Sequence, residues 1–178
     1  MIATLVSERL VLKPLTIDHC TQEYVAWMNN PDVFKYLETG GSYKIEDLQN
    51  YLRGVESTPS ILFWAIHLKR NDKHIGNIKI DPVNKRHGLG EYGIMMGDST
   101  EWGKGYAKEA SELVINHCFQ DLGIRKITLG VVEDNLAALN LYKKMGFSTE
   151  GVFVDHGYYD GKLCSLIRMA IFNTSNDK

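Results

Sequence analysis

A glycine-rich turn that leads straight into the longest predicted helix is the strongest constraint on how this chain folds. The turn reads Trp102-Gly103-Lys104-Gly105-Tyr106-Ala107, and its helix is predicted over residues 104–122, with Gly123 as C-cap. The first N–H groups of a helix have no partner inside it, and glycine lets a ligand approach the main chain closely. The turn therefore predicts a pyrophosphate site, although a plain strand-to-helix turn fits the spacing equally well.

Two other phosphate-binding motifs do not fit this turn. A P-loop would continue with a Lys-Ser or Lys-Thr pair, which is missing here. A dinucleotide-binding turn would need a third glycine and an early place in the chain. The pyrophosphate is thus expected to belong to a cofactor held by backbone N–H groups, with Lys104 adding a positive charge.

Composition limits the classes of function. The 178 residues suit one domain over residues 1–178, and a net charge of −2 excludes non-specific nucleic-acid binding. The three cysteines, Cys20, Cys118 and Cys164, fit neither a disulfide framework nor a zinc site, so reduced thiols and no metal are expected. Without a visible signal peptide or a membrane-length apolar run, we expect a cytoplasmic protein with no membrane partner.

The hydrophobic period changes along the chain from helical to strand-like and then alternates. A strand over 9–13 ends at Pro14, Asp18 is expected to cap a helix over 19–29, and Pro31 opens a short helical piece. A helix over 44–56 precedes strands 61–68, 74–80 and 90–96, with His67 and His74 expected at the surface of a hairpin. Further along, strand 126–132, helix 135–145 and strands 147–153 and 163–172 follow the long helix. This order predicts an α/β fold in which a mixed sheet is flanked by helices.

A second motif begins about thirty residues after the glycines: Asn135-x-x-Ala138-x-x-Leu141-Tyr142-x-Lys144-x-Gly146-Phe147. Asn135 stands at a helix start, where it can cap its own helix, contact a ligand, or do both. Tyr142 lies two turns later on the same face. A tyrosine at this spacing is more often core than catalyst, so its hydroxyl needs a partner, for which a cofactor is one candidate.

Together, these two motifs resemble the GNAT superfamily of acyl-CoA-dependent N-acetyltransferases. The opening Ser7-Glu8-Arg9-Leu10-Val11-Leu12-Lys13-Pro14-Leu15 is similar to that of its RimJ/RimL branch. The segments Gly146-Phe147-x-x-Glu150-Gly151 and Tyr159-Asp160-Gly161 with Arg168-Met169 add to the likeness, which covers essentially the whole chain. The resemblance implies a mostly antiparallel, seven-stranded sheet that splays apart between its fourth strand (91–96) and fifth strand (126–133).

The same resemblance implies acetyl-CoA as cosubstrate. Its pyrophosphate would lie on the turn and its pantetheine arm against the fourth strand, with Asn135 and Tyr142 also touching it. The implied cofactor-binding residues are Ile94, Met95, Met96, Trp102, Gly103, Lys104, Gly105, Tyr106, Ala107, Asn135 and Tyr142. The family often has Gln or Arg where this chain has Trp102, which affects side-chain roles more than the backbone-based phosphate binding.

The chemistry implied is attack of a primary amine on the thioester, with Tyr142 as general acid. A phenol with a pKa near 10 stays protonated at neutral pH and can protonate the departing thiolate. Glu91, which begins the splayed strand, is the candidate general base, although a glutamate there is more often simply solvated. Family position also indicates the substrate-binding residues, although a place in the core is the default for their aromatic members: Trp27, Phe34, Tyr36, Glu38, Glu91, His156 and Tyr158.

The sequence thus predicts an enzyme that transfers acetyl from acetyl-CoA to a primary amine without an acyl-enzyme. Three acceptors stay open: a protein N-terminus, a polyamine-like amine, and an amino sugar or sugar nucleotide. A non-catalytic CoA-binding module is the alternative. The presence of Tyr142 disfavours it, because a protein without activity would not need that hydroxyl. A nucleotide-dependent transferase is disfavoured by the missing Lys-Ser/Thr pair, and a homodimer is compatible with the sequence.

Overall fold

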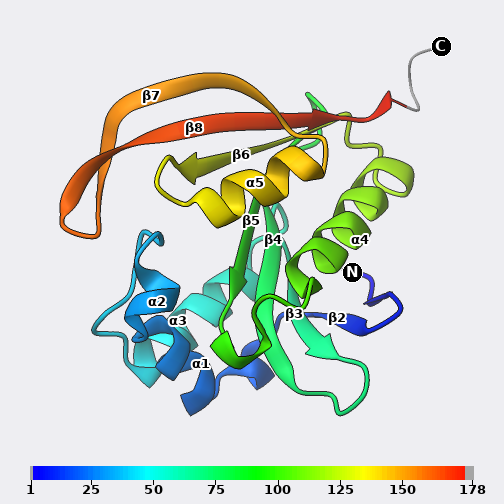
Figure 1. Cartoon of the computed structure of the whole chain (residues 1–178). Coiled ribbons are helices and arrows are strands. Elements are labelled where there is room, and N and C mark those ends of the chain that lie inside the picture. Colours follow the sequence, from blue (N-terminus) through cyan, green and yellow to red (C-terminus); the bar gives the residue numbers. More distant parts are fainter. Residues whose placement is uncertain (1, 175–178) are drawn as a thin grey trace.

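The fold is built on a single mixed sheet (Figure 1). The structure is a computed structural model that describes residues 2–174. Its eight strands lie in the order β1-β2-β3-β4-β5-β6-β8-β7. All neighbours are antiparallel except β5 and β6. The strands are β1 (Leu5–Val6), β2 (Leu10–Pro14), β3 (Leu62–Leu68), β4 (His74–Asn84), β5 (Leu89–Met96), β6 (Lys126–Val132), β7 (Ser148–Tyr159) and β8 (Lys162–Phe172).

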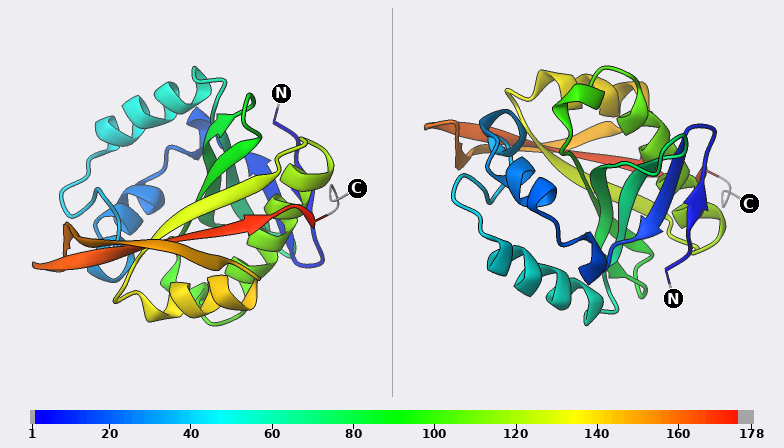
Figure 2. Two further views of the ribbon diagram at one scale, coloured as in Figure 1. Left: turned by 90° about the horizontal axis from the view of Figure 1, so that it is seen from above. Right: turned by 90° about the horizontal axis from the view of Figure 1, so that it is seen from below.

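Helices cover both faces of this sheet, as the views from above and from below show (Figure 2). They are η1 (Ile17–His19), α1 (Gln22–Met28), α2 (Pro31–Phe34), α3 (Ile45–Glu56), η2 (Ser99–Glu101), α4 (Tyr106–Gln120) and α5 (Leu136–Lys144). In the described part of the chain, no helix is long and apolar enough to cross a membrane.

Strand alternation divides the core between the two faces. Successive side chains of a strand point to opposite sides, so Trp64 and Ile66 of β3 join the cluster around α4, while Phe63 and Ala65 join α1 and α3. Because both faces are covered, β3 is an almost continuous apolar run instead of an alternating one. The two clusters hold the helices on opposite sides of the strands that form the site.

The predicted fold class is confirmed, with some corrections. The sheet has eight strands instead of seven, because the two-residue β1 pairs with β2. Thr21, and not Asp18, caps α1: its hydroxyl accepts from the Tyr24 N–H at 3.2 Å. His67, expected at the surface, is only 8% exposed. The extent of the domain, residues 1–178, stays a prediction.

Candidate active site

Strands β5 and β6 part after a short stretch of pairing. Their parallel register joins only Leu89–Glu91 to Lys126–Thr128. Beyond this point β5 continues against β4 as far as Met96, and β6 continues against β8 as far as Val132. Their facing edges are therefore left without a neighbouring strand, as predicted for the fourth and fifth strands.

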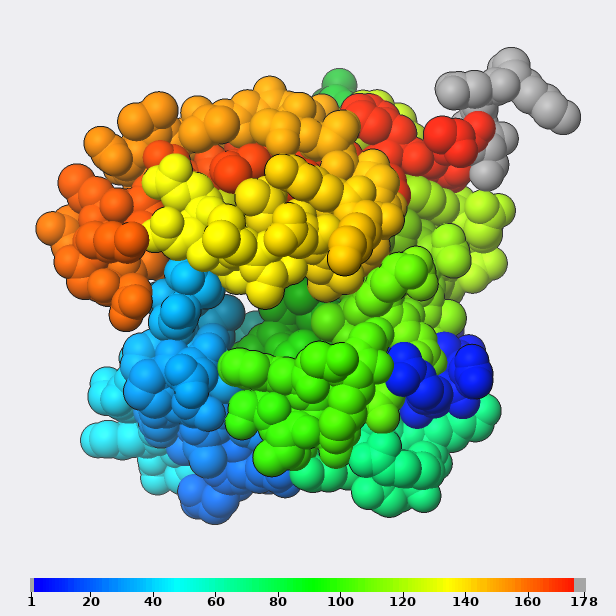
Figure 3. Space-filling view, viewed as in Figure 1, coloured from blue at the N-terminus to red at the C-terminus, as the bar shows by residue number. Residues whose placement is uncertain are grey.

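A cavity of about 1260 Å³ extends from this gap. The space-filling view shows a hollow between α5 and the segment leading into α4 (Figure 3). One part, here called the loop half, is lined by Ile94, Met96, Trp102, Gly103, Gly105, Tyr106, Ala107, Asn135, Ala138, Leu141 and Tyr142. The other, the aromatic half, faces α1 and α3 and is lined by Tyr24, Met28, Tyr43, Tyr51, Phe63, Asn77, Lys79 and Met95.

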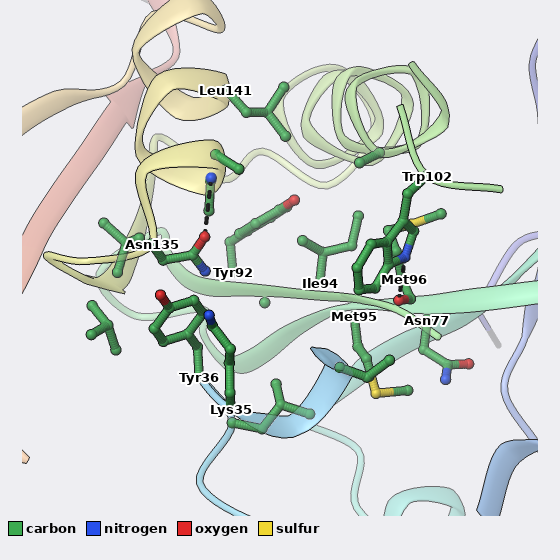
Figure 4. A pocket seen from close by; sticks show the side chains of 18 of the residues that line it. Lys35, Tyr36, Asn77, Tyr92, Ile94, Met95, Met96, Trp102, Asn135 and Leu141 are labelled. Atoms are coloured by element: carbon green, nitrogen blue, oxygen red, sulfur yellow. Dashed lines mark hydrogen bonds between the residues drawn. The ribbon is translucent and has the colours of Figure 1, made fainter. Parts of the chain in front are cut away.

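The free edge of β5 offers backbone groups at alternate residues. The Gly97 N–H donates to Ile75 of β4 at 3.0 Å, and the antiparallel register is regular from Met96 to Tyr92. Alternation then turns the N–H and C=O of Met95 toward β4, and those of Ile94 and Met96 toward the gap. The Met96 carbonyl already accepts from Trp102 Nε1 at 2.9 Å (Figure 4). Of the three residues predicted to meet pantetheine, Ile94 has both backbone groups available.

The glycine-rich turn has the backbone form that its sequence predicts. Gly103 and Gly105 have φ of +75° and +83°, the left-handed region that other residues rarely adopt. Gly105 is the N-cap of α4 and, lacking a side chain, leaves the first helical N–H groups without a side-chain cap. No acceptor within residues 2–174 pairs with the N–H groups of residues 104–107. They are free to bind an anion at the positive end of a helix of 15 residues.

Arg9 braces this turn from the start of β2. Its guanidinium donates to the Lys104 carbonyl at 2.9 Å, forms an ion pair with Glu109 at 2.7 Å and lies 4.6 Å from the centre of the Tyr106 ring. Burial alone would raise the pKa of Glu109, but hydrogen bonds from Arg9 and Ser7 outweigh it, and the pKa is lowered. The carboxylate therefore stays charged and holds the turn in place.

The ammonium group of Lys104 is paired with a carboxylate. Its Nζ lies 2.8 Å from Glu101, a buried carboxylate that also binds Arg70 at 3.0 Å. Lys104 is absent from the cavity wall. Its backbone N–H remains a candidate anion ligand, whereas its ammonium group is engaged elsewhere.

Asn135 caps α5 in the way the motif predicts. Its Oδ1 accepts from the Ala138 N–H at 3.2 Å (Figure 4). The residue also lines the loop half of the cavity. The cap uses one of the two lone pairs of this oxygen and neither of the amide N–H groups, so Asn135 keeps its NH2 group for a ligand.

Tyr142 lines the loop half and is nearly buried between the rings of Tyr92 and Phe147. Burial raises its pKa to about 12. The Ser111 hydroxyl lies 2.6 Å from the Ala107 carbonyl, to which it donates, and accepts from Tyr92 at 2.6 Å. Tyr142 is thus a protonated phenol at neutral pH, set beside a second buried phenol.

Glu91, the predicted base, does not line the cavity. Its two carboxylate oxygens accept from Arg168 at 2.6 and 2.7 Å, and Thr128 donates a third hydrogen bond. The carboxylate belongs to the closed end of the gap, where β5 and β6 are still paired. The structure therefore places Glu91 in an ion pair outside the cavity lining, and its role as a base stays a prediction.

The predicted substrate-binding residues fall into two groups. Tyr36 and Glu38 line the cavity. Tyr36 donates to the Asp134 carbonyl at 3.2 Å, and Glu38 accepts from Tyr159. Four others do not line the cavity. These four are Trp27, which packs beneath Gly97, Phe34, which packs on Gly40, and the exposed His156 and Tyr158 of β7.

The aromatic half holds residues that sequence reasoning missed. Tyr43 comes just before the helix predicted for 44–56, and Tyr51 lies within that helix. Phe63 and Asn77 lie on the predicted strands 61–68 and 74–80. Their common signal is strand alternation: Phe63, Asn77, Lys79 and Met95 all face α1 and α3.

Comparison with known proteins identifies the class. A family model described as the acetyltransferase (GNAT) domain matches residues 9–148, so this chain belongs to the GNAT acetyltransferases. This confirms the predicted enzyme class, an acetyl-CoA-dependent N-acetyltransferase. The RimJ/RimL branch is not distinguished by this match.

Individual relatives are distant. An uncharacterized N-acetyltransferase of Bacillus licheniformis is 23% identical over 171 residues, covering 94% of this chain and 95% of the relative. The spermidine N(1)-acetyltransferase of Escherichia coli is 32% identical over 97 residues, covering 54% and 52%. The crystal structure of the Vibrio cholerae spermidine N-acetyltransferase with CoA and spermine matches with a TM-score of 0.86 at 21% identity, covering 94% of this chain and 98% of that one.

Proposed function

We propose that this enzyme moves acetyl from acetyl-CoA to a small primary amine by direct attack, with Tyr142 as general acid. One observation carries the proposal: a single cavity joins the free N–H groups of the glycine-rich turn to an aromatic chamber through the gap between β5 and β6. Such a passage would hold a thioester in the gap while an amine enters from the far side.

In this reaction the amine nitrogen bonds to the acetyl carbon, and the carbon–sulfur bond breaks. A backbone N–H at the free edge of β5, such as that of Ile94, would stabilise the charge on the carbonyl oxygen. The phenol of Tyr142 would give its proton to the departing thiolate, and water in the open cavity would take the proton of the amine. Since Glu91 is paired with Arg168, the proposal needs no role for it.

Relatives and motifs support different acceptors. The spermidine acetyltransferases among the relatives support a small amine, and the opening Ser7-Glu8-Arg9 segment, if the chain is RimJ/RimL-like, supports a protein N-terminus. We propose a small amine as the acceptor, a class that includes small molecules with a free α-amino group. A cytoplasmic site of action and a homodimer also remain proposals.

Thiol release tests the function directly. Purified enzyme with acetyl-CoA is given peptides, polyamines and amino sugars, and free CoA is measured with a thiol reagent. The proposal expects amine-dependent release and an N-acetylated product by mass spectrometry. CoA binding without release on any amine would instead support the non-catalytic CoA-binding module.

A further inference from the structure

Asn77, a lining residue of the aromatic half, carries a buried and unpaired side-chain nitrogen. It lies on β4 opposite Met95 of β5, is only 2% exposed and lines the cavity (Figure 4). Among residues 2–174, no acceptor pairs with its Nδ2. Buried amide groups are nearly always hydrogen-bonded in folded proteins, so an unpaired one beside a cavity indicates a missing partner.

His74 fixes which end of the amide is unpaired. Its Nε2 lies 3.0 Å from the Gly76 carbonyl and 2.9 Å from Asn77 Oδ1. A carbonyl only accepts, so this nitrogen carries a proton, and the amide atom facing it is the oxygen. The assignment is the same for neutral and protonated His74, because Nε2 donates in both forms. The NH2 group is therefore the part of the Asn77 amide that has no partner among residues 2–174.

The imidazole that orients Asn77 is itself held by aromatic rings. His74 stacks on His67 with ring centres 5.1 Å apart and meets the Trp27 ring edge-on at 4.8 Å. His67 is fixed in turn, since its Nδ1 lies 2.8 Å from the Asp72 carbonyl, and a ring nitrogen facing a carbonyl donates to it. These contacts leave His74 little freedom to turn, so the amide direction is built into the fold.

Lys79 adds a second donor on the same face of β4, two residues further along the strand. Its ammonium is half-buried, pairs with Asp81 at 3.0 Å and lies 5.9 Å from the Phe63 ring. Of the acidic residues that line the cavity, Glu101 is paired with Arg70 and Lys104, while Asp32 and Glu38 belong to the α2 side. The β4 side of the aromatic half thus offers N–H donors, with the charge of Lys79 balanced by Asp81.

We propose that Asn77 binds an oxygen atom of the amine substrate, so that the preferred acceptor carries a carbonyl or hydroxyl group beside its reacting amine. This inference rests on the proposed function. An ammonium group has donors and no acceptor, so a polyamine protonated along its length cannot satisfy the Asn77 NH2 group. An α-amino carbonyl compound or an amino sugar can, and discrimination is large when a buried donor would otherwise stay unpaired.

Matched acceptors test the proposal. Alaninamide is compared with isopropylamine, and glucosamine with cyclohexylamine; in each pair one member carries oxygen-bearing groups and the other does not, and spermidine is the polyamine probe. Since those groups also lower the pKa of the amine, every kcat/KM is expressed per concentration of neutral amine. We expect kcat/KM for at least one oxygen-bearing member to exceed that of its oxygen-free match and of spermidine by about tenfold or more. The pair with the larger ratio tells a carbonyl from a hydroxyl.

Variants connect that ratio to Asn77. Asn77→Leu and Asn77→Asp keep the shape but remove the N–H donors, and each is expected to bring the ratio to about one. Asn50→Leu, the same change on the exposed face of α3, is the control and should keep it. Calorimetric measurement of acetyl-CoA affinity verifies that each variant is folded. If Asn77→Leu does not fold, Asn77→Asp provides the test.

The outcomes separate the two proposals. If no amine releases thiol, the proposed function fails and the inference fails with it. The role of Asn77 is overturned, and the enzyme function stands, in either of two cases. In the first, kcat/KM for spermidine and the oxygen-free amines equals that for the oxygen-bearing amines. In the second, Asn77→Leu leaves the ratio of these kcat/KM values unchanged.

Discussion

Arg168 holds the carboxylate of Glu91 with two parallel hydrogen bonds of 2.6 and 2.7 Å. This fork geometry gives Arg–carboxylate pairs their strength and direction. The pair ties β8 to β5 across β6, at the point where β5 and β6 stop pairing. It therefore fastens the closed end of the gap, and hydrogen bonding to Glu91 raises the pKa of Arg168.

Glu91→Gln should affect stability more than catalysis. The change leaves the partly buried Arg168 without a counter-charge, so we expect the free energy of unfolding to fall by about 1–3 kcal/mol. We expect kcat to stay within about threefold, because the carboxylate lies outside the cavity. Urea unfolding and thiol release measure the two effects. Glu150→Gln, which breaks an exposed ion pair to Lys126, is the control, and should cost less than about 1 kcal/mol. A hundredfold loss of kcat with unchanged stability would restore Glu91 as the base.

Tyr142→Phe removes the proposed acid. General acid catalysis by a side chain contributes about 10²–10⁴-fold, so kcat should fall at least about a hundredfold while the Kd of acetyl-CoA changes little. Since burial raises the pKa of Tyr142 to about 12, activity should show no loss from its ionisation between pH 7 and pH 10. Steady-state kinetics and calorimetry give both quantities, with the exposed Tyr158→Phe as a control. Full activity in Tyr142→Phe would remove the residue from the mechanism.

Gly105→Val tests the glycine-rich turn. Gly105 has a φ of +83°, and a Cβ added there would come 3.4 Å from Arg9 Nη2, so the branched side chain disturbs the N–H groups and their brace. We expect the Kd of CoA to rise at least about tenfold, since the anion site loses its geometry. Gly151→Val on β7, where nothing lies within 4 Å of the added Cβ, is the comparison. Equal CoA affinity in the two variants would move the pyrophosphate elsewhere.

His74 should make the fold sensitive to acid. Burial lowers its pKa from 6.5 to about 4, so the unfolded chain binds a proton more readily between these values. The contribution of His74 to the free energy of unfolding is therefore fully present above pH 6.5. It is lost as the pH falls toward 4, and the loss amounts to roughly 3 kcal/mol at most. Urea unfolding across pH 4–7 should show a smaller slope in His74→Gln, while the exposed His156→Gln keeps the wild-type slope. Equal slopes in all three proteins would place the His74 titration near its ordinary value.

Local signals in the sequence predicted the main-chain part of the site. Gly103 and Gly105 are required by their own backbone angles, and Asn135 caps the helix that it begins. Each depends on residues within a few positions, so periodicity and capping rules were sufficient. The GNAT resemblance added the gap between β5 and β6, which the register confirms.

Side-chain partners far apart in the chain could not be predicted in this way. Glu91 looked like an open strand end because Arg168 lies 77 positions away. Asn77 read as an ordinary strand residue, since its orientation depends on His74 and on the absence of a partner across the cavity. The two-residue β1 is too short to show alternation, and its existence depends on pairing with β2.

A crystal structure with bound CoA tests the central claim most directly. The account predicts the pyrophosphate against the N–H groups of residues 104–107, the pantetheine arm along the free edge of β5 at Ile94, and the sulfur beside the Tyr142 hydroxyl. CoA bound outside the gap between β5 and β6, or a sulfur far from Tyr142, would contradict it.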